Sequence, residues 1–435
     1  MAIKFLHVAD THIGVENYGR PATEDDIAKL PPYFSPGVDR SEYIGFSTRL
    51  LDFLSTFDYM VNYALEHDVD LFILAGDAYK LRNPSQTHQR EFARRISTLV
   101  KEGGIPIFSV IGNHDAPQMA GRATSLEIFP TLEKENVYIA DQLRTYRVPT
   151  RQGVIQLIAL PWIKRAAFLA RDETRDLNIE QVTDMLEERI NRLLDKEVSG
   201  LSDSLPTILC GHITASTASA GSERNMMLGK DHTILLGKLA NPAFDYVALG
   251  HIHKHQILSY QPMVTYSGSI QRVDFSEEKE DKGFCVIDLD PTLPAGERLT
   301  NFHFEKVNAR SFQTIDVSVT TGEDPTRKTE DAIMNRSTKE AIVRVRITMP
   351  RQVSAAFDET YIRKLLSTAH QVSIKTILEE KTKTIRLSLE SSKNLSPMNL
   401  LAQYLESTNL SKERITVLKD YADQLINESN ETDDS

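Results

Sequence analysis

Five short segments of this chain carry side chains that bind metal ions, and most of them follow an apolar run. The segments are ADTHIG, LAGDAY, IGNHDAP, CGHITA and LGHIHKH. Their candidate ligands are Asp10, His12, Asp77, Asn113, His212, His251 and His253. Four imidazoles, two carboxylates and one amide make a mixed nitrogen and oxygen donor set. Such a set favours manganese, iron or zinc over magnesium.

The spacing of these residues predicts a site with two metal ions. Asp10 and His12 are two residues apart in an extended segment, so both side chains can hold the same ion. The carboxylate of Asp77 has two oxygens and can bridge two cations, while His251 and His253 can each reach one of them. Two ions about 3.5–4 Å apart activate water and neutralise phosphate oxygens during an in-line displacement. The five segments together therefore indicate a metal-dependent phosphoesterase.

Residues beside the ligands are candidates for acid–base chemistry. His114 follows Asn113 and is placed to contact the phosphate and protonate the leaving oxygen. Asp115 could orient that imidazole by accepting its other N–H. Gly76, before Asp77, lets the backbone approach a metal or phosphate closely.

Alternating strand and helix patterns supply the scaffold for these residues. Strands are predicted at residues 3–10, 70–77, 106–112, 154–162, 207–212 and 245–250. Helices are predicted at about residues 46–66, 86–102 and 178–197. The alternation indicates an α/β sandwich. The candidate ligands cluster at the carboxyl ends of the strands, which is where open α/β sheets place their sites.

The rest of the chain divides into smaller parts. Residues 15–45 contain four prolines and are predicted to form a surface insertion. A break at residues 290–300 precedes a small α+β domain. Its predicted strands lie at residues 313–319, 341–348, 372–378 and 384–389, with a helix at 358–369. The chain ends in two helices, capped by Ser396 and Ser411, which either pack on the protein itself or dock a partner.

Composition limits the class of protein. A chain of 435 residues is expected to form roughly two or three domains. Its net charge of −11 argues against binding nucleic acid through overall basicity, although bound cations can supply positive charge locally. Two cysteines imply no disulfide framework. The sequence shows no signal peptide and no apolar run of ~18 residues, so we expect a cytoplasmic protein without membrane contact.

The ordered motifs DxH, GD, GNHD, GH and GHxH resemble those of the calcineurin-like metallophosphoesterase superfamily. Residues 264–289, VTYSGSIQRVDFSEEKEDKGFCVIDL, resemble the segment after the last histidine pair in the SbcD and Mre-eleven nucleases. The resemblance implies a four-layer α/β sandwich with a small α+β capping domain and a C-terminal helical hairpin. The implied parts are a nuclease domain (1–290), a DNA-binding capping domain (301–392) and C-terminal helices (395–428). The composition of the acidic, polar residues 429–435 predicts a disordered tail.

The same resemblance implies the nuclease subunit of a DNA double-strand-break repair complex. Its activities would be 3′-to-5′ exonuclease on duplex ends and endonuclease on single-stranded or hairpin DNA. It would use two Mn²⁺ ions per chain. One ion would be held by Asp10, His12, Asp77 and His253, and the other by Asp77, Asn113, His212 and His251. His114 would serve the leaving group. The chain would form a homodimer within a heterotetramer, and its C-terminal helices would bind an SbcC-type, SMC-like ATPase.

One departure concerns Lys80, because relatives often have His or Asp three residues after the bridging Asp. Lysine cannot replace a neutral base or a metal ligand, but it could contact phosphate as a point charge. Several basic residues near the motifs are candidates for substrate binding, although each could equally be a solvated surface charge. They are Lys80, Arg82, Arg122, Lys254 and Arg272.

Two alternative functions share the metal site or the partner. The chain could be a phosphodiesterase or phosphatase for small molecules or proteins, which would leave the 264–289 segment unexplained. It could also be a scaffold that regulates the ATPase, although a scaffold would usually have lost a ligand.

Overall fold

The computed structural model describes residues 2–117, 121–163, 178–219, 233–379, 398, 401–402, 405 and 412–432. The chain forms two compact units. The larger unit comprises Met1–Val317, Thr329–Arg346 and Asp358–Lys375, and the smaller comprises Ser318–Lys328, Ile347–Phe357 and Thr376–Ser435. In the described part of the chain, no helix combines the length and apolar character that crossing a membrane requires.

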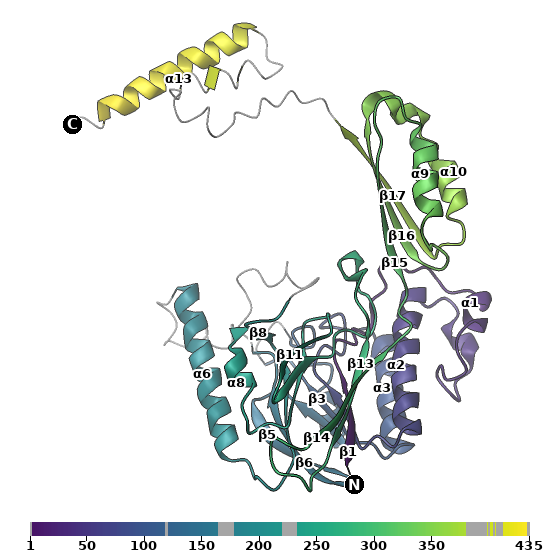
Figure 1. The fold of residues 1–435 in the computed structure, drawn as a ribbon, viewed down its shortest axis with the longest axis vertical. Coiled ribbons are helices and arrows are strands. Elements are labelled where there is room, and N and C mark those ends of the chain that lie inside the picture. Colours follow the sequence, from purple (N-terminus) through teal and green to yellow (C-terminus); the bar gives the residue numbers. More distant parts are fainter. Residues whose placement is uncertain are drawn as a thin grey trace. The chain divides into compact units, whose positions relative to one another are not determined.

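Two six-stranded sheets form the centre of the larger unit (Figure 1). The first sheet has the order β14 (Leu299–Lys306), β13 (Gly283–Leu289), β1 (Ile3–Val8), β2 (Leu71–Leu74), β3 (Ile107–Val110) and β4 (Val137–Ala140). The second has the order β11 (Gln256–Tyr260), β12 (Met263–Tyr266), β10 (Tyr246–Gly250), β7 (Thr207–His212), β6 (Gly153–Leu160) and β5 (Arg144–Thr150). Strands β1 to β4 are parallel, as are β12, β10, β7 and β6. Their carboxyl ends therefore lie along one edge of each sheet.

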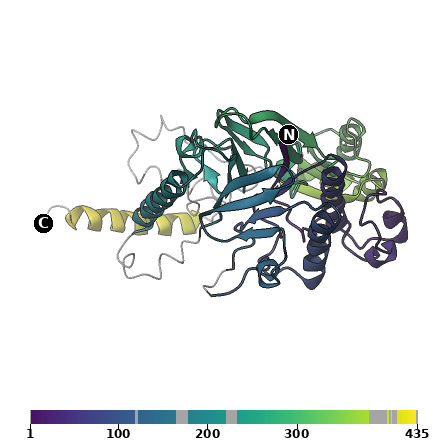
Figure 2. The ribbon, with the colours of Figure 1, turned by 90° about the horizontal axis from the view of Figure 1, so that it is seen from below.

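Helices cover the outer faces of both sheets and complete four layers (Figures 1 and 2). The covering helices are α2 (Thr48–Glu66) and α3 (Gln86–Lys101) on the first sheet, and α6 (Ile179–Ser199) and α8 (Leu236–Leu239) on the second. Alternate residues of a strand face opposite layers: Leu6 packs with the helices, whereas Phe5 packs between the sheets. The predicted α/β class is confirmed, and the six predicted strands overlap β1, β2, β3, β6, β7 and β10.

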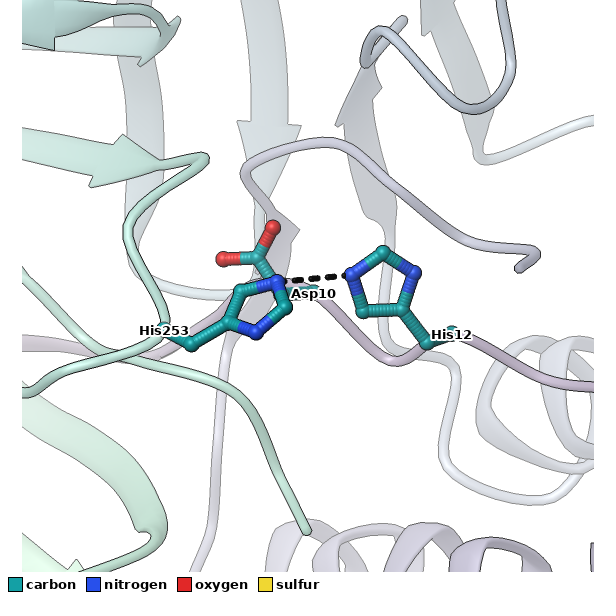
Figure 3. Close-up of side chains that lie close together, drawn as sticks. All are labelled: Asp10, His12 and His253. Atoms are coloured by element: carbon teal, nitrogen blue, oxygen red, sulfur yellow. Dashed lines mark hydrogen bonds between the residues drawn. The ribbon is translucent and has the colours of Figure 1, made fainter. Parts of the chain in front are cut away.

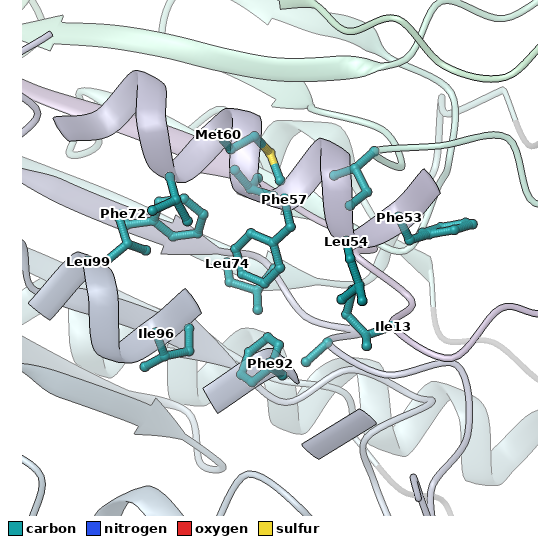
Figure 4. Packing of buried hydrophobic residues seen from close by; sticks show 14 of the residues in the cluster. Ile13, Phe53, Leu54, Phe57, Met60, Phe72, Leu74, Phe92, Ile96 and Leu99 are labelled. Atoms are coloured by element: carbon teal, nitrogen blue, oxygen red, sulfur yellow. The ribbon is translucent and has the colours of Figure 1, made fainter. Parts of the chain in front are cut away.

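Aromatic side chains join α2 and α3 to the first sheet (Figure 4). The ring centroid of Phe57 lies 6.1 Å from that of Phe72 and 5.7 Å from that of Phe92. All three side chains are buried, and burial of one such ring contributes about 1.5–3 kcal/mol. This layer holds the loops after β1, β2 and β3 on a rigid base.

The stretch 15–45, predicted to be a surface insertion, contributes to this core. It contains the helices α1 (Glu24–Ala28) and η1 (Arg40–Tyr43). Phe34 and Tyr43 are buried, and the Tyr43 hydroxyl donates to Glu91 of α3 at 3.1 Å. The insertion is therefore packed against α2 and α3.

The first domain extends further than predicted. Strand β14 pairs along its length with β13, so it belongs to the first sheet, and the boundary predicted between residues 290 and 301 lies too early. A salt bridge of Arg310 with Asp52 of α2, at 2.5 Å, fixes the connector after β14. His370 also bonds Thr48 at 2.9 Å.

The small α+β domain that the sequence predicts after the nuclease domain contains a three-stranded sheet of order β15-β16-β17. Its elements are β15 (Phe312–Ser318), α9 (Pro325–Met334), β16 (Ile342–Pro350), η4 (Arg351–Ala356), α10 (Glu359–Leu365) and β17 (Gln371–Glu379). Three predicted strands and the predicted helix correspond to β15, β16, β17 and α10, and α9 was not foreseen. The strand predicted at 384–389 lies outside the described residues. Shorter elements elsewhere in the chain are α4 (Ile128–Thr131), β8 (Thr214–Ala215), β9 (Thr233–Ile234) and η3 (Phe275–Glu277).

The last described element is the helix α13, Lys412–Thr432. It begins next to Ser411, as the sequence predicts, and it includes residues 429–432, which we expected to be disordered. Most of the first predicted C-terminal helix lies outside the described residues.

Candidate metal centre

The five ligand segments meet at the carboxyl ends of parallel strands, as predicted. They follow β1, β2 and β3 of the first sheet, and β7 and β10 of the second. The sequence-predicted ligands that are at most 5% exposed are Asp10, His12, Asp77, His212, His251 and His253. Asn113 is half-buried. The site is thus enclosed where the two sheets face each other.

One group of ligand atoms belongs to Asp10, His12 and His253 (Figure 3). Their candidate donor atoms lie within 4.8 Å of one another. Nε2 of His12 lies 2.9 Å from Nε2 of His253, and Oδ2 of Asp77 lies 3.8 Å from the same His12 nitrogen. These four residues are the set that the family resemblance assigns to one ion.

The second group surrounds Asn113. Oδ1 of Asn113 lies 2.9 Å from Nε2 of His212 and 3.0 Å from Nδ1 of His251. Oδ2 of Asp77 is 3.4 Å from Nε2 of His212. The same Asp77 oxygen therefore lies between the two groups, in the position that a bridging carboxylate requires.

Hydrogen bonds on the far side of two rings turn the Nε2 atom of each ring toward the site. Nδ1 of His212 must donate to the carbonyl of Ala75, 2.8 Å away, because a carbonyl only accepts. In the neutral ring Nε2 then presents a lone pair to the oxygens of Asn113 and Asp77. Nδ1 of His253 likewise donates to the carboxylate of Glu277 at 2.8 Å. When these rings are neutral and metal replaces the shared protons, their Nε2 lone pairs join the carboxylate and amide oxygens as donors, so these residues fit two divalent ions.

Electrostatics at Asp77 support the same conclusion. Burial disfavours the charged carboxylate, yet the neighbouring His212 holds the pKa of Asp77 well below its usual range. Burial also disfavours protonated His212, but the Asp77 carboxylate raises the pKa of His212 to about 9. Without a metal ion the pair retains a proton that a cation would replace.

The backbone at the ligands adopts left-handed conformations. Their φ angles are +51° at Asp10, +41° at His12, +54° at Asp77 and +95° at His251. Each such residue costs about 1–3 kcal/mol, and such strain clusters at functional sites. Gly76 also has φ of +88°, and a Cβ there would lie 2.2 Å from Nδ1 of His212. Gly76 therefore makes room for an imidazole, and the close approach of its backbone to a metal or phosphate stays a prediction.

His114 lies against the ligands, as predicted. Its backbone N–H donates to Oδ1 of Asp77 at 2.8 Å, and its ring centroid is 5.0 Å from that of His12. Nδ1 donates to the carbonyl of Lys80 at 2.8 Å, so Nε2 is the atom available for proton exchange. Burial lowers the pKa of His114, although Asp77 opposes this shift.

The predicted contact between Asp115 and His114 is not what the structure shows. The buried Asp115 carboxylate accepts backbone N–H groups of Gly112 at 3.0 Å, and of Ala78 and Tyr79 at 3.3 Å each. Asp115 therefore joins two ligand loops, and the Lys80 carbonyl orients His114. Burial raises the pKa of Asp115 to about 7.

The basic candidates have different surroundings. Arg272 donates to the carbonyls of Glu280, Ala309 and Arg310 at 2.8–3.1 Å, so its guanidinium holds the protein backbone, and substrate binding by Arg272 stays a prediction. Lys80 is half-buried. Burial is the main cause of the lowered pKa values of His12 and His114, and the charge of Lys80 lowers both further. The other candidates are exposed and remain predictions: Arg82, Arg122 and Lys254.

Two residues at the site were missed from the sequence. The ring of Trp162 lies 5.0 Å from that of His251, where it covers one side of the second group. Glu277 contacts His253 from the segment that resembles the SbcD and Mre-eleven proteins. That resemblance was the available signal for Glu277, since neither spacing nor apolar pattern marks it.

The family model for calcineurin-like phosphoesterases matches residues 3–255 of this chain. The match covers more than half of the sequence and includes all seven predicted ligands. The chain therefore belongs to the calcineurin-like phosphoesterase family.

Within that family the chain is similar to proteins of the SbcD type. The SbcD subunit of nuclease SbcCD from Staphylococcus epidermidis is 26% identical over 289 residues, which are 66% of each chain. The protein of the same name from Staphylococcus saprophyticus is 24% identical over 288 residues, again 66% of each chain. The match thus spans 66% of the length of these relatives. A dimetal phosphatase structure from Danio rerio is 11% identical and covers 66% of this chain and 92% of its own, with a TM-score of 0.32 that supports no argument.

Proposed function

We propose that this protein is the manganese-dependent nuclease subunit of a DNA double-strand-break repair complex. The observation that carries the proposal is the convergence of the seven predicted ligand side chains at the strand ends, with Asp77 between the two groups. Its support for DNA as the substrate is the similarity to two proteins named as the SbcD subunit of nuclease SbcCD. We also propose that the protein acts in the cytoplasm.

The residues of the site have distinct tasks in this proposal. Two bound divalent ions would activate water and neutralise the phosphate oxygens. The Lys80 carbonyl holds His114 with Nε2 available, so this nitrogen would protonate the leaving oxygen. The half-buried Lys80 would contact a phosphate of the DNA as a point charge.

The partners follow from the same similarity. We propose an SbcC-type, SMC-like ATPase as the partner and a homodimer of this chain within a heterotetramer. The C-terminal helices would dock the ATPase. Val417 and Tyr421 support this role, because they are 45% and 65% exposed and lie four residues apart on α13. The capping domain would bind DNA, and the activities would be 3′-to-5′ exonuclease and hairpin endonuclease.

A cleavage assay tests the proposal. End-labelled duplex, single-stranded and hairpin DNA are incubated with the full chain and Mn²⁺, with and without the ATPase. We expect cleavage only when metal is present, and a loss of roughly 100-fold or more for His114→Ala. Mn²⁺ binding by His114→Ala is measured in parallel, because a loss of catalysis should leave most of the metal affinity.

The outcomes separate the alternatives. An absence of metal-dependent DNA cleavage in every mixture would contradict the proposal. Turnover of small phosphodiesters alone would indicate the small-molecule enzyme. Stimulation of the ATPase without any hydrolysis of phosphodiesters would indicate the scaffold.

A further inference from the structure

A buried carboxylate outside the ligand set contacts one of the ligands. Glu277 ends the three-residue helix η3, and its side chain is 0% exposed. Oε1 of Glu277 lies 2.8 Å from Nδ1 of His253. Oε2 pairs with the ammonium of Lys282 at 2.7 Å and accepts the N–H of Val273 at 3.0 Å. The two oxygens thus have separate partners.

The contact with Oε1 determines which form of His253 the site contains. A carboxylate accepts hydrogen bonds, so Nδ1 of His253 carries the proton and Nε2 of the neutral ring has the lone pair. Nε2 is the atom that lies 2.9 Å from Nε2 of His12. The ammonium of Lys282 also donates to the backbone carbonyl of His253 at 3.0 Å. Both the ring and the backbone of this ligand are therefore held by one ion pair.

Stability alone gives little reason for such a pair. Removing two charges from water is costly, and apolar side chains of similar volume often stabilise a fold as well as a buried ion pair does. Lys282 is itself 0% exposed and already has Glu280 at 2.9 Å. A purely structural ion pair of Glu277 with Lys282 would not require Oε1 of Glu277 to face the imidazole of His253.

We propose that Glu277 is a positioning residue of the metal centre, which fixes the tautomer and ring orientation of His253 for binding a divalent cation. The proposal rests on the metal centre of the proposed function, but it does not depend on DNA as the substrate. A carboxylate that holds a ligand histidine in this way typically changes metal affinity by 10–100-fold. Glu277 itself does not touch the metal or the substrate in this proposal.

Metal titration of the full chain tests this role. Calorimetric titration with Mn²⁺ compares wild type with Glu277→Ala, Glu277→Gln and Glu280→Gln. Glu280 is the matched control, because it pairs with the same Lys282 but, among the described contacts, does not reach His253. We expect Glu277→Ala to bind one of two ions about 10–100-fold more weakly. Glu277→Gln should lose less, because its amide oxygen still accepts the imidazole N–H, and Glu280→Gln should bind like wild type.

A spectroscopic readout accompanies the titration. The visible spectrum of Co²⁺ bound in place of Mn²⁺ reports ligand geometry, and it should change in Glu277→Ala but not in Glu280→Gln. Thermal unfolding of each variant shows which ones are folded. If Glu277→Ala does not fold, the comparison of Glu277→Gln with Glu280→Gln decides: weaker binding by Glu277→Gln supports the role, and equal binding overturns it.

Other outcomes would also overturn the proposal. One is wild-type affinity for both ions in folded Glu277→Ala. Another is an equal loss in Glu280→Gln, because the ion pair with Lys282 would then explain the effect. A wild-type chain that binds two ions but leaves DNA intact would refute the nuclease proposal alone. A wild-type chain that binds no ion would refute both.

Discussion

At the residue scale, hydrogen bonds outside the ligand set prepare the histidines of the centre. The Ala75 carbonyl sets the tautomer of His212, the Glu277 carboxylate that of His253, and the Lys80 carbonyl that of His114. In each case the Nδ1–H group donates a hydrogen bond to an acceptor outside the site. The Nε2 atom of the same ring therefore faces the site. The chemistry of the centre therefore depends on groups that bind no metal.

Lys80 gives a prediction at this scale. Lys80→Met keeps the side-chain stem and both backbone contacts, the N–H to Ile13 and the carbonyl to His114, but removes the charge. A lost contact between ammonium and phosphate should raise KM for DNA about tenfold and leave Mn²⁺ affinity close to that of wild type. Steady-state cleavage assays at several salt concentrations measure this, with Lys101→Met as the control, because Lys101 is exposed and lies outside the motif segments. An unchanged KM would show that Lys80 contacts no phosphate.

His7 gives a prediction for the pH dependence of stability. Burial lowers the pKa of His7 to about 3, against a hydrogen bond with the Leu249 carbonyl, and His255 lowers it further. Between this value and the unfolded value near 6.5, only the unfolded chain binds the proton at residue 7. Stability is therefore lost as the pH falls through this window, by roughly 1.4 kcal/mol per pH unit.

The variant His7→Gln isolates this contribution. Urea unfolding at about pH 5 and about pH 6, with chelator present, gives the free energy of unfolding of both proteins. We expect the difference between the two pH values to be smaller in His7→Gln by roughly 1.4 kcal/mol, whatever the variant's overall stability. Identical pH dependence in the two proteins would contradict a buried, neutral His7.

At the element scale, the strand ends determine where the ligands lie. The loops after β1, β2, β3, β7 and β10 all begin at the same edge of the two sheets, so residues far apart in sequence meet. The helices α2 and α3 support the first three of these loops from outside. Precision at the site thus depends on the packing of this layer.

The packing of α2 gives a prediction for stability. Phe57 is 0% exposed and contacts Phe72 and Phe92, so Phe57→Ala should lower the free energy of unfolding by about 3–5 kcal/mol. Leu65→Ala on the same helix is the control, because Leu65 is 37% exposed and should cost clearly less. Urea unfolding measures both. Equal losses would show that the aromatic cluster is not a principal part of the core.

The strands, and the meeting of the candidate ligand segments at their ends, could be predicted from the sequence for a physical reason. Apolar runs followed by Asp, Asn or His depend on local order alone, and His212 and Asp77 lie where this pattern indicates. The partners of Asp115 and Arg272 depend on loops from other parts of the chain, which local patterns do not reveal. Glu277 was missed for the same reason, since its contact with His253 spans 24 residues.

At the scale of the whole molecule, the metal ligands and the C-terminal helix belong to separate units. All seven predicted ligands lie between residues 10 and 253, and α13 begins at residue 412. Functions that depend on these two parts should therefore separate experimentally. If DNA is the substrate, as we propose, the net charge of −11 implies that attraction to it comes from bound cations and local basic residues.

A deletion tests that separation. Removal of residues 395–435 should leave Mn²⁺ binding intact and abolish binding of the ATPase in a pull-down. The full-length double variant Val417→Ser with Tyr421→Ser is a finer test, because it removes two exposed apolar side chains and keeps the helix. We expect it to weaken ATPase binding strongly. Unchanged binding after the deletion would refute the docking role of these helices.

The number of Mn²⁺ ions bound per chain tests the central claim most directly. Equilibrium dialysis of the full chain against Mn²⁺, followed by metal analysis, should give two ions for wild type. Asp77→Ala should weaken both, because the Asp77 carboxylate lies between the two groups of ligands. A wild-type chain that binds one ion or none at saturating Mn²⁺, or an Asp77→Ala chain that still binds two ions with wild-type affinity, would contradict the two-metal centre.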